Sequence, residues 1–148
     1  MDSKPGYLRS ALLAALLLWP LCGLSAPEVL VEAGSANKYL ANSSDPGIGL
    51  DWTAETYPGE TGWSDGSYGI GYENGSGGAS NLFQTTVPVG TQSVYTRTTF
   101  TIADITAVSV ISLGVDYDDG YVAWINGVKV FRSSSMPATG DPLWNTVL

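Results

Sequence analysis

Residues 108–131 read VSVISLGVDYDDGYVAWINGVKVF, and this stretch decides the fold class. Two dipeptides within it, Asp119-Gly120 and Asn126-Gly127, suit hairpin turns, because Asp, Asn and Gly tolerate the positive φ angles that such turns need. The strand-forming runs around them span 108–117, 121–125 and 128–131. The stretch therefore predicts a three-stranded antiparallel meander.

Alternating apolar residues give the first of these strands one apolar face. The side chains expected on it are Ile111, Leu113, Val115 and Tyr117. Such a face has to be covered, because each large apolar side chain left in water forgoes roughly 1.5–3 kcal/mol. We therefore expect residues 26–148 alone to be marginally folded or prone to aggregate.

The chain upstream of the meander shows no helical periodicity. Residues 94–102 are rich in β-branched and aromatic types and predict a strand, and 103–107 predict a connector of a single helical turn. Residues 37–90 are dominated by Gly, Ser, Asn, Asp and Pro, which predicts long loops and short strands, and 29–31 predict a leading strand. The expected class is all-β, with two packed antiparallel sheets.

The first 25 residues differ from the rest and predict a secretory signal peptide. Lys4 and Arg9 precede an apolar run that starts at Ala11 and is too short to span a bilayer comfortably. Gly23 and Ser25 are the small residues that cleavage after Ser25 requires. An uncleaved membrane anchor is the alternative.

Cleavage at that position leaves a secreted domain without thiol chemistry, because the single cysteine, Cys22, is removed. The predicted organisation is a signal peptide at 1–25, a lead-in at 26–35 and one module at 36–148. The expected location is extracellular or periplasmic, with no stable insertion into a membrane after cleavage.

Composition excludes several classes of function. The 148 residues include 14 acidic and 6 basic side chains, for a formal net charge of −8, and no His. Clustered Lys and Arg are what bind nucleic acids and anionic membrane surfaces, so neither is an expected partner. Without His, the sequence has no Ser-His-Asp or Cys-His catalysis and no His-ligated metal.

A series of short motifs runs through the chain. In order they are Tyr39-Leu40, Ser44-Asp45-Pro46-Gly47, Asp51-Trp52, Gly62-Trp63-Ser64-Asp65, Gly69-Ile70-Gly71-Tyr72, Tyr95-Thr96-Arg97-Thr98-Thr99-Phe100, and Asp118-Asp119-Gly120 followed by Asn126-Gly127. The series resembles the galactose-binding-like jelly-roll modules attached to secreted glycoside hydrolases, phosphatases and large bacterial surface proteins. The resemblance covers residues 36–140 and implies an antiparallel β-sandwich with a non-catalytic role.

The resemblance also implies that the sandwich is incomplete at its C-terminal end. In those modules, further strands follow the Asn-Gly hairpin and a Met-Pro turn, which Met136-Pro137 matches, whereas this sequence ends at Leu148. We expect at least two closing strands to come from the remainder of the full-length chain; completion by another chain is the alternative.

Three carboxylates at short spacing, Asp116, Asp118 and Asp119, are the first candidates for a structural Ca²⁺ site, because Ca²⁺ prefers oxygen ligands. Asp45 and Asp51 are equally fair candidates on other loops. The spacing excludes an EF-hand loop, since Gly127 stands where the bidentate Glu belongs. The alternative is hairpin chemistry, in which Asp118 caps the turn.

Aromatic side chains are the candidates for stacking against a sugar ring. They are Trp52, Trp63, Tyr72 and Trp124. The alternative is that these rings pin loops or belong to the core. Arg97 is a candidate ligand contact, or else a buried partner of a carboxylate such as Asp116 or Asp118.

The predicted function is that of a secreted accessory module without catalytic activity that binds a polysaccharide or glycan, as a fragment of a larger extracellular enzyme or surface protein. The alternative is a ligand-free structural spacer of a multidomain extracellular protein. Paired carboxylates acting on a sugar would make it a hydrolase, but nothing singles out two of the acidic residues for that role.

Overall fold

The computed structural model describes residues 27–75 and 78–146. Its strands are β1 (Ala36–Asn42), β2 (Ser64–Ser67), β3 (Ile70–Gly71), β4 (Thr85–Thr86), β5 (Ser93–Arg97), β6 (Val122–Ile125) and β7 (Val128–Arg132). Short 3-10 turns lie at Asp51–Thr53, Pro58–Gly62, Ser80–Leu82 and Ile105–Ala107. This part of the chain is therefore rich in β-structure and has no α-helix, as the all-β prediction requires.

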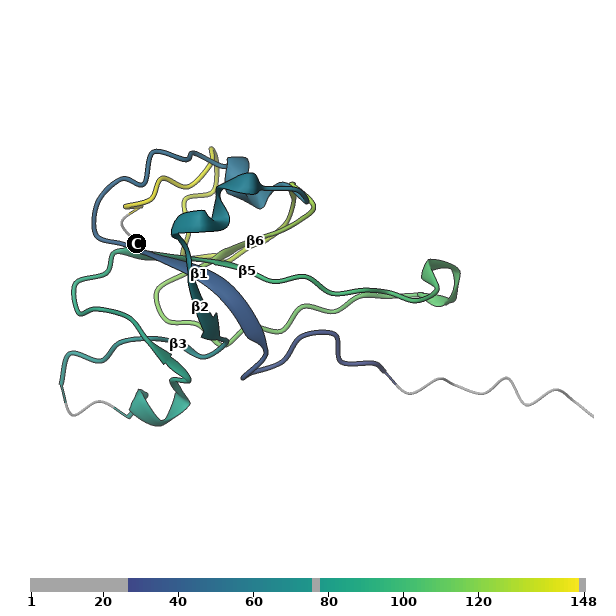
Figure 1. The fold of residues 1–148 in the computed structure, drawn as a ribbon, viewed down its shortest axis with the longest axis horizontal. Coiled ribbons are helices and arrows are strands. Elements are labelled where there is room, and N and C mark those ends of the chain that lie inside the picture. Colours follow the sequence, from purple (N-terminus) through teal and green to yellow (C-terminus); the bar gives the residue numbers. More distant parts are fainter. Residues whose placement is uncertain (1–26, 76–77, 147–148) are drawn as a thin grey trace, which may run out of the picture.

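The largest sheet has the order β2–β1–β5, and β1 is antiparallel to both neighbours (Figure 1). Lys38 in β1 lies opposite both Asp65 in β2 and Arg97 in β5. Residues directly opposite one another project from the same side of a sheet, so these three share a face. β3 and β4 form a separate, parallel pair of two residues each.

Two of the predicted strands differ from the structure: one does not form, and one is shorter than predicted. No strand forms at 29–31, where Val29 is exposed and has no neighbouring strand. β5 ends at Arg97 instead of continuing to 102, because β1 pairs with it only as far as Lys38. A strand persists only where a neighbour offers backbone groups to bond.

The hairpin predicted from Asn126-Gly127 is confirmed. β6 and β7 are antiparallel, and the two turn residues have φ angles of 49° and 79°, in the left-handed region that the turn requires. The backbone N–H of Gly127 donates a hydrogen bond of 2.8 Å to the carbonyl oxygen of Thr53. The tip of the hairpin is thereby fixed to the loop that carries Trp52.

The first strand of the predicted meander, at 108–117, does not form, so the prediction of three strands was wrong. The chain leaves β5, runs out to the turn Ile105–Ala107 and returns over 108–117 towards β6 (Figure 1). We call residues 98–117 the arm. No backbone hydrogen bond joins 109–117 to any other described residue. Alternating apolar residues predict which way side chains face, but they do not supply a neighbouring strand.

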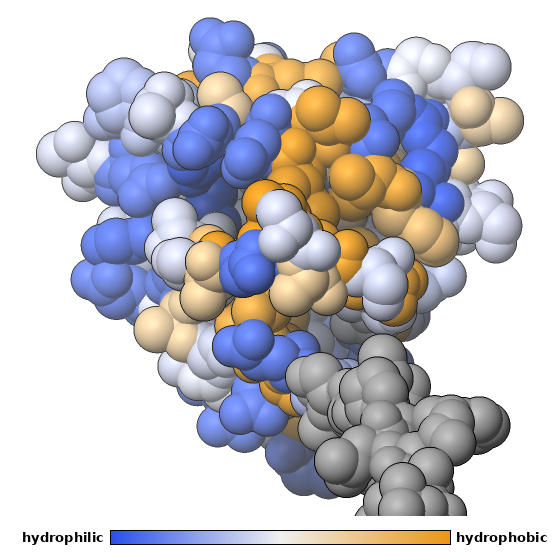
Figure 2. All heavy atoms as spheres, turned by 90° about the vertical axis from the view of Figure 1, so that its right-hand side faces the viewer, coloured by the Kyte–Doolittle hydropathy of each residue, from blue (hydrophilic) through white to orange (hydrophobic). Residues whose placement is uncertain are grey.

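Few apolar side chains of the described chain are buried; they are Trp52, Trp63 and Val87. Large exposed apolar side chains gather instead on the arm and the hairpin: Val110, Ile111, Leu113, Val115, Tyr117, Ile125, Val128, Val130 and Phe131. Figure 2 shows an apolar area on the side of the molecule from which the arm projects. In the ranges 27–75 and 78–146, no helix has the length and apolarity needed to cross a bilayer.

Candidate functional site

Trp52 lies at the centre of an aromatic cluster. Its ring stacks on that of Tyr95, with centroids 4.6 Å apart and planes at 11°. Trp63 approaches it at 5.9 Å, and Trp124 of β6 packs edge-on at 5.5 Å. The cluster joins the sheet that contains β5 to the β6–β7 hairpin.

The structure therefore brings together three of the four rings proposed for sugar stacking, but it turns them towards one another. Trp52 and Trp63 are each only 8% exposed, which leaves little ring surface for a ligand. Tyr72 is half-buried, and its ring makes no aromatic contact with this cluster. This arrangement favours the alternative in which the rings pin loops.

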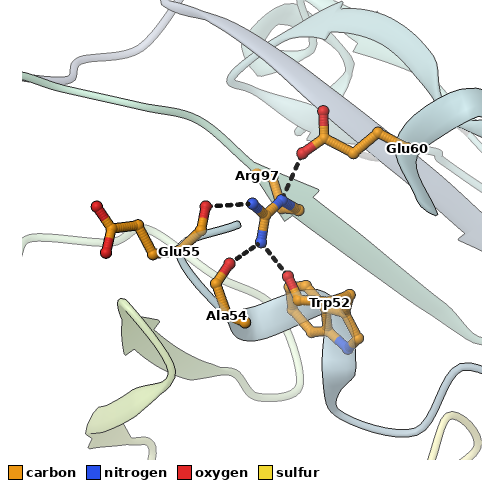
Figure 3. Close-up of polar contacts among 5 residues, drawn as sticks. All are labelled: Trp52, Ala54, Glu55, Glu60 and Arg97. Carbon is orange, nitrogen blue, oxygen red and sulfur yellow. Dashed lines mark hydrogen bonds and ion pairs between the residues drawn. The ribbon is translucent and has the colours of Figure 1, made fainter. Parts of the chain in front are cut away.

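Arg97 ties the same loop to the sheet (Figure 3). Its Nη1 donates hydrogen bonds to the carbonyl oxygens of Trp52 and, at 2.8 Å, of Ala54, and its Nη2 donates to that of Glu55 at 3.3 Å. Its Nε pairs with Oε1 of Glu60 at 2.6 Å. The guanidinium is thus bound by one carboxylate and three carbonyls.

Arg97 does pair with a carboxylate, as the alternative expected, but the partner is Glu60 and not Asp116 or Asp118. The reason is position: both Asp residues lie at the base of the arm, whereas Glu60 lies on the 3-10 turn Pro58–Gly62. The Tyr57 ring completes the surroundings of Arg97, with its centroid 5.6 Å from the guanidinium carbon. Sequence reasoning missed Glu60, because nothing local relates it to a residue 37 positions away.

A polar groove of about 250 Å³ opens beside this Arg–Glu pair. Its walls carry a second ion pair, in which Lys38 Nζ lies 2.7 Å from Asp65 Oδ1. The register places Lys38 opposite Asp65, which accounts for this second pair, and opposite Arg97, which brings the two ion pairs side by side. The remaining lining residues are Ala36, Asn37, Thr98 and Thr99. The groove thus holds the Lys38 ammonium, two carboxylates and two Thr hydroxyl groups within one small volume.

The five Asp residues proposed as Ca²⁺ ligands are not brought together. Asp118 accepts a hydrogen bond of 3.0 Å from the backbone N–H of Asp119, and Asp45 accepts one of 2.8 Å from that of Gly47. Asp51 opens a separate 3-10 turn. Among the described residues, no three carboxylate, Cys or His side chains are grouped as metal ligands would be. The geometry of Asp118 matches the alternative of a turn cap.

Two tyrosine phenols have shifted pKa values. Burial raises the pKa of Tyr95, and the nearby Asp45 carboxylate raises it further. Burial also raises the pKa of Tyr68, against the opposing effect of a hydrogen bond with Thr96. Both groups therefore keep their protons at neutral pH, and neither is prepared to act as a base.

Searches of protein-family models, of curated proteins and of solved structures found no match to this chain.

Proposed function

We propose that this chain is a secreted, non-catalytic structural module of a larger multidomain extracellular protein. In this proposal the fold is a β-sandwich of the galactose-binding-like, jelly-roll type. The β2–β1–β5 sheet and the β6–β7 hairpin contribute to its two layers, and the loop carrying Trp52 lies between them. The spacer role, rather than sugar binding, is the role that the geometry supports best.

The proposal rests on one observation: the side chains of Trp52 and Arg97 are occupied by contacts within the protein. In a sugar-binding site, a ring face and a guanidinium are left open to receive the ligand. Here the Trp52 ring is covered by Tyr95, Trp63 and Trp124. The Arg97 side chain is only 14% exposed, and its donors are used by the protein itself.

Binding to a panel of insoluble and soluble polysaccharides tests this role. We expect no retention of the 148-residue protein on any of them. We also expect Trp52→Ala to lower the free energy of unfolding by about 3–5 kcal/mol, the usual cost of deleting a buried Trp side chain. Val89→Ala is the matched control, since Val89 is 70% exposed. Retention on a polysaccharide that Trp52→Ala abolishes without loss of stability would overturn the proposal.

One observation favours glycan binding as a second candidate function, at the polar groove rather than at the Trp residues. Hydroxyl groups of sugars both donate and accept hydrogen bonds, and the groove presents both kinds of partner in Lys38 and Asp65. If the groove binds a glycan, Asp65→Asn and Lys38→Met abolish retention on that glycan while leaving the thermal melt unchanged. Lys129→Met is the control, because it removes a similar exposed ion pair, with Asp141, outside the groove.

A further inference from the structure

The chain contains two Asn-Gly dipeptides, Asn74-Gly75 and Asn126-Gly127, and both Asn residues are exposed. An Asn side chain can react with its own backbone, because the peptide nitrogen of the next residue can attack the side-chain amide carbon, Cγ. Glycine in the second position favours this attack, since it has no Cβ to obstruct the approach and rotates more freely than other residues. The structure holds the two dipeptides in different ways.

The hairpin fixes the second dipeptide. Asn126-Gly127 connects the paired residues Ile125 and Val128, and its φ angles of 49° and 79° set the geometry of the turn. The N–H of Gly127, which contains the attacking nitrogen, donates a hydrogen bond of 2.8 Å to the carbonyl oxygen of Thr53. Attack on Asn126 therefore requires the loss of this hydrogen bond and of the turn geometry.

The first dipeptide lies in the loop between β3 and β4. No backbone hydrogen bond joins Asn74 or Gly75 to another residue that the structure describes. A Cβ built on Gly75 would meet nothing within 4 Å, so the space around this residue is open. The nitrogen of Gly75 can therefore approach Cγ of Asn74 without the structural losses that the hairpin imposes on Asn126.

We propose that Asn74 is a site of spontaneous deamidation in the folded protein, and that the hairpin protects Asn126 from the same reaction. A base in the solvent removes the N–H proton of Gly75, and the nitrogen forms a bond to Cγ of Asn74. The bond between Cγ and Nδ2 breaks, and Nδ2 leaves as ammonia, which closes a succinimide ring. Water then opens the ring at either carbonyl carbon and leaves aspartate or isoaspartate at position 74.

The modified chain differs from the encoded one in charge and in backbone. Either product adds a carboxylate to a chain whose formal net charge is already −8. Isoaspartate also lengthens the main chain by a methylene group. The change is confined to the loop between β3 and β4, so the β2–β1–β5 sheet and the β6–β7 hairpin should keep their stability.

Peptide mapping by mass spectrometry measures both positions in one sample of the 148-residue protein, incubated at mildly alkaline pH. In the folded protein we expect Asn74 to react about tenfold faster than Asn126 or more, since the loss of one backbone hydrogen bond is enough to slow a reaction by about this factor. In guanidinium chloride the turn is lost. The rate at Asn126 should then rise by about tenfold, whereas the rate at Asn74 should change little.

Gly75→Ala tests the assigned nitrogen. The added Cβ should slow deamidation at Asn74 by about tenfold and leave the thermal melt unchanged, because it meets no other atom within 4 Å. Gly78→Ala is the matched control: it makes the same substitution in the same loop, also in open space, but not after an Asn, and should leave the rate at Asn74 unchanged.

Equal rates at Asn74 and Asn126 in the folded protein would overturn the inference. So would an unchanged rate at Asn74 in Gly75→Ala, or a rate at Asn74 that rises on unfolding as much as the rate at Asn126 does. The reaction involves neither a polysaccharide nor a partner chain, so its outcome is independent of the proposed structural role.

Discussion

Arg97 and Trp52 are 45 residues apart in sequence, yet the guanidinium of Arg97 donates a hydrogen bond to the carbonyl oxygen of Trp52. Tyr95 lies two residues before Arg97 on β5 and therefore projects from the same face. Its ring stacks on the indole of Trp52. One strand thus contacts both the backbone and the side chain of Trp52, and the loop that carries Trp52 in turn contacts the hairpin.

Replacing Arg97 should destabilise the fold more than its single ion pair would suggest. Arg97→Met leaves three carbonyl oxygens and Glu60 without their donor, which we expect to lower the free energy of unfolding by about 3 kcal/mol. Arg97→Lys should recover only part of this loss, because an ammonium lacks the planar fork of donors. Lys129→Met, which breaks an exposed pair, should cost less than about 1 kcal/mol. Urea unfolding measures the free energy of unfolding of all three variants. Equal decreases for Arg97→Met and Lys129→Met would show that the guanidinium stabilises the fold no more than an exposed ion pair does.

Gly127 should be sensitive to the addition of a single methyl group. Its φ of 79° is in the left-handed region, which costs a residue with a Cβ about 1–2 kcal/mol. A Cβ there would lie 3.8 Å from Ala54 Cα, an ordinary contact, so the expected cost of Gly127→Ala comes from the backbone alone. Gly114→Ala is the control, because a Cβ at that position of the arm meets nothing within 4 Å and its φ is not positive. A thermal melt that is unchanged for Gly127→Ala would contradict the assigned turn.

Stability should decline at alkaline pH. Tyr68 and Tyr95 have raised pKa values in the folded state, compared with a value of 10.0 in an unstructured chain. The unfolded chain therefore releases these protons first, and the free energy of unfolding falls as the pH rises above that value but not below it. Urea midpoints between about pH 8 and about pH 11 measure the decline, which Tyr95→Phe should make shallower. A midpoint that rises over this interval would contradict the burial of these phenols.

Export is a prediction on residues that lie outside the described ranges. Expressed in a secreting host, the protein should be recovered outside the cytoplasm with its first residue at or close to Ala26 and without a free thiol, because Cys22 is removed. N-terminal sequencing and thiol titration check both points. Recovery in the membrane fraction with Met1 retained would instead support the uncleaved anchor.

The features predicted correctly from the sequence are those with a local cause. Asn126-Gly127 determines its own turn, so the β6–β7 hairpin was predictable. The strand at 108–117 was predicted wrongly, since alternation reports side-chain direction and not the presence of a neighbour. β1, the longest strand of the large sheet, was hidden among turn-forming residues because its pairing depends on β2 and β5, which are distant in sequence.

The candidate site was likewise predictable only in part. The sequence identified Trp52 and Arg97 as unusual, but burial, which is a property of the whole fold, separates a loop pin from a ligand contact. The ion pair between Arg97 and Glu60 likewise depends on how a loop lies over the sheet. The polar groove was missed because Lys38 and Asp65 meet only through the register of two strands.

The central claim is that Arg97 and Trp52 hold the large sheet and the hairpin together as one structural unit. Amide hydrogen exchange of the wild-type protein and of Arg97→Met tests it most directly. The account predicts that protection falls together in β1, β5, β6 and β7 of the variant, because the loop carrying Trp52 is their shared connection. Loss of protection confined to the loop at residues 51–60, with the hairpin protected as in the wild type, would contradict it.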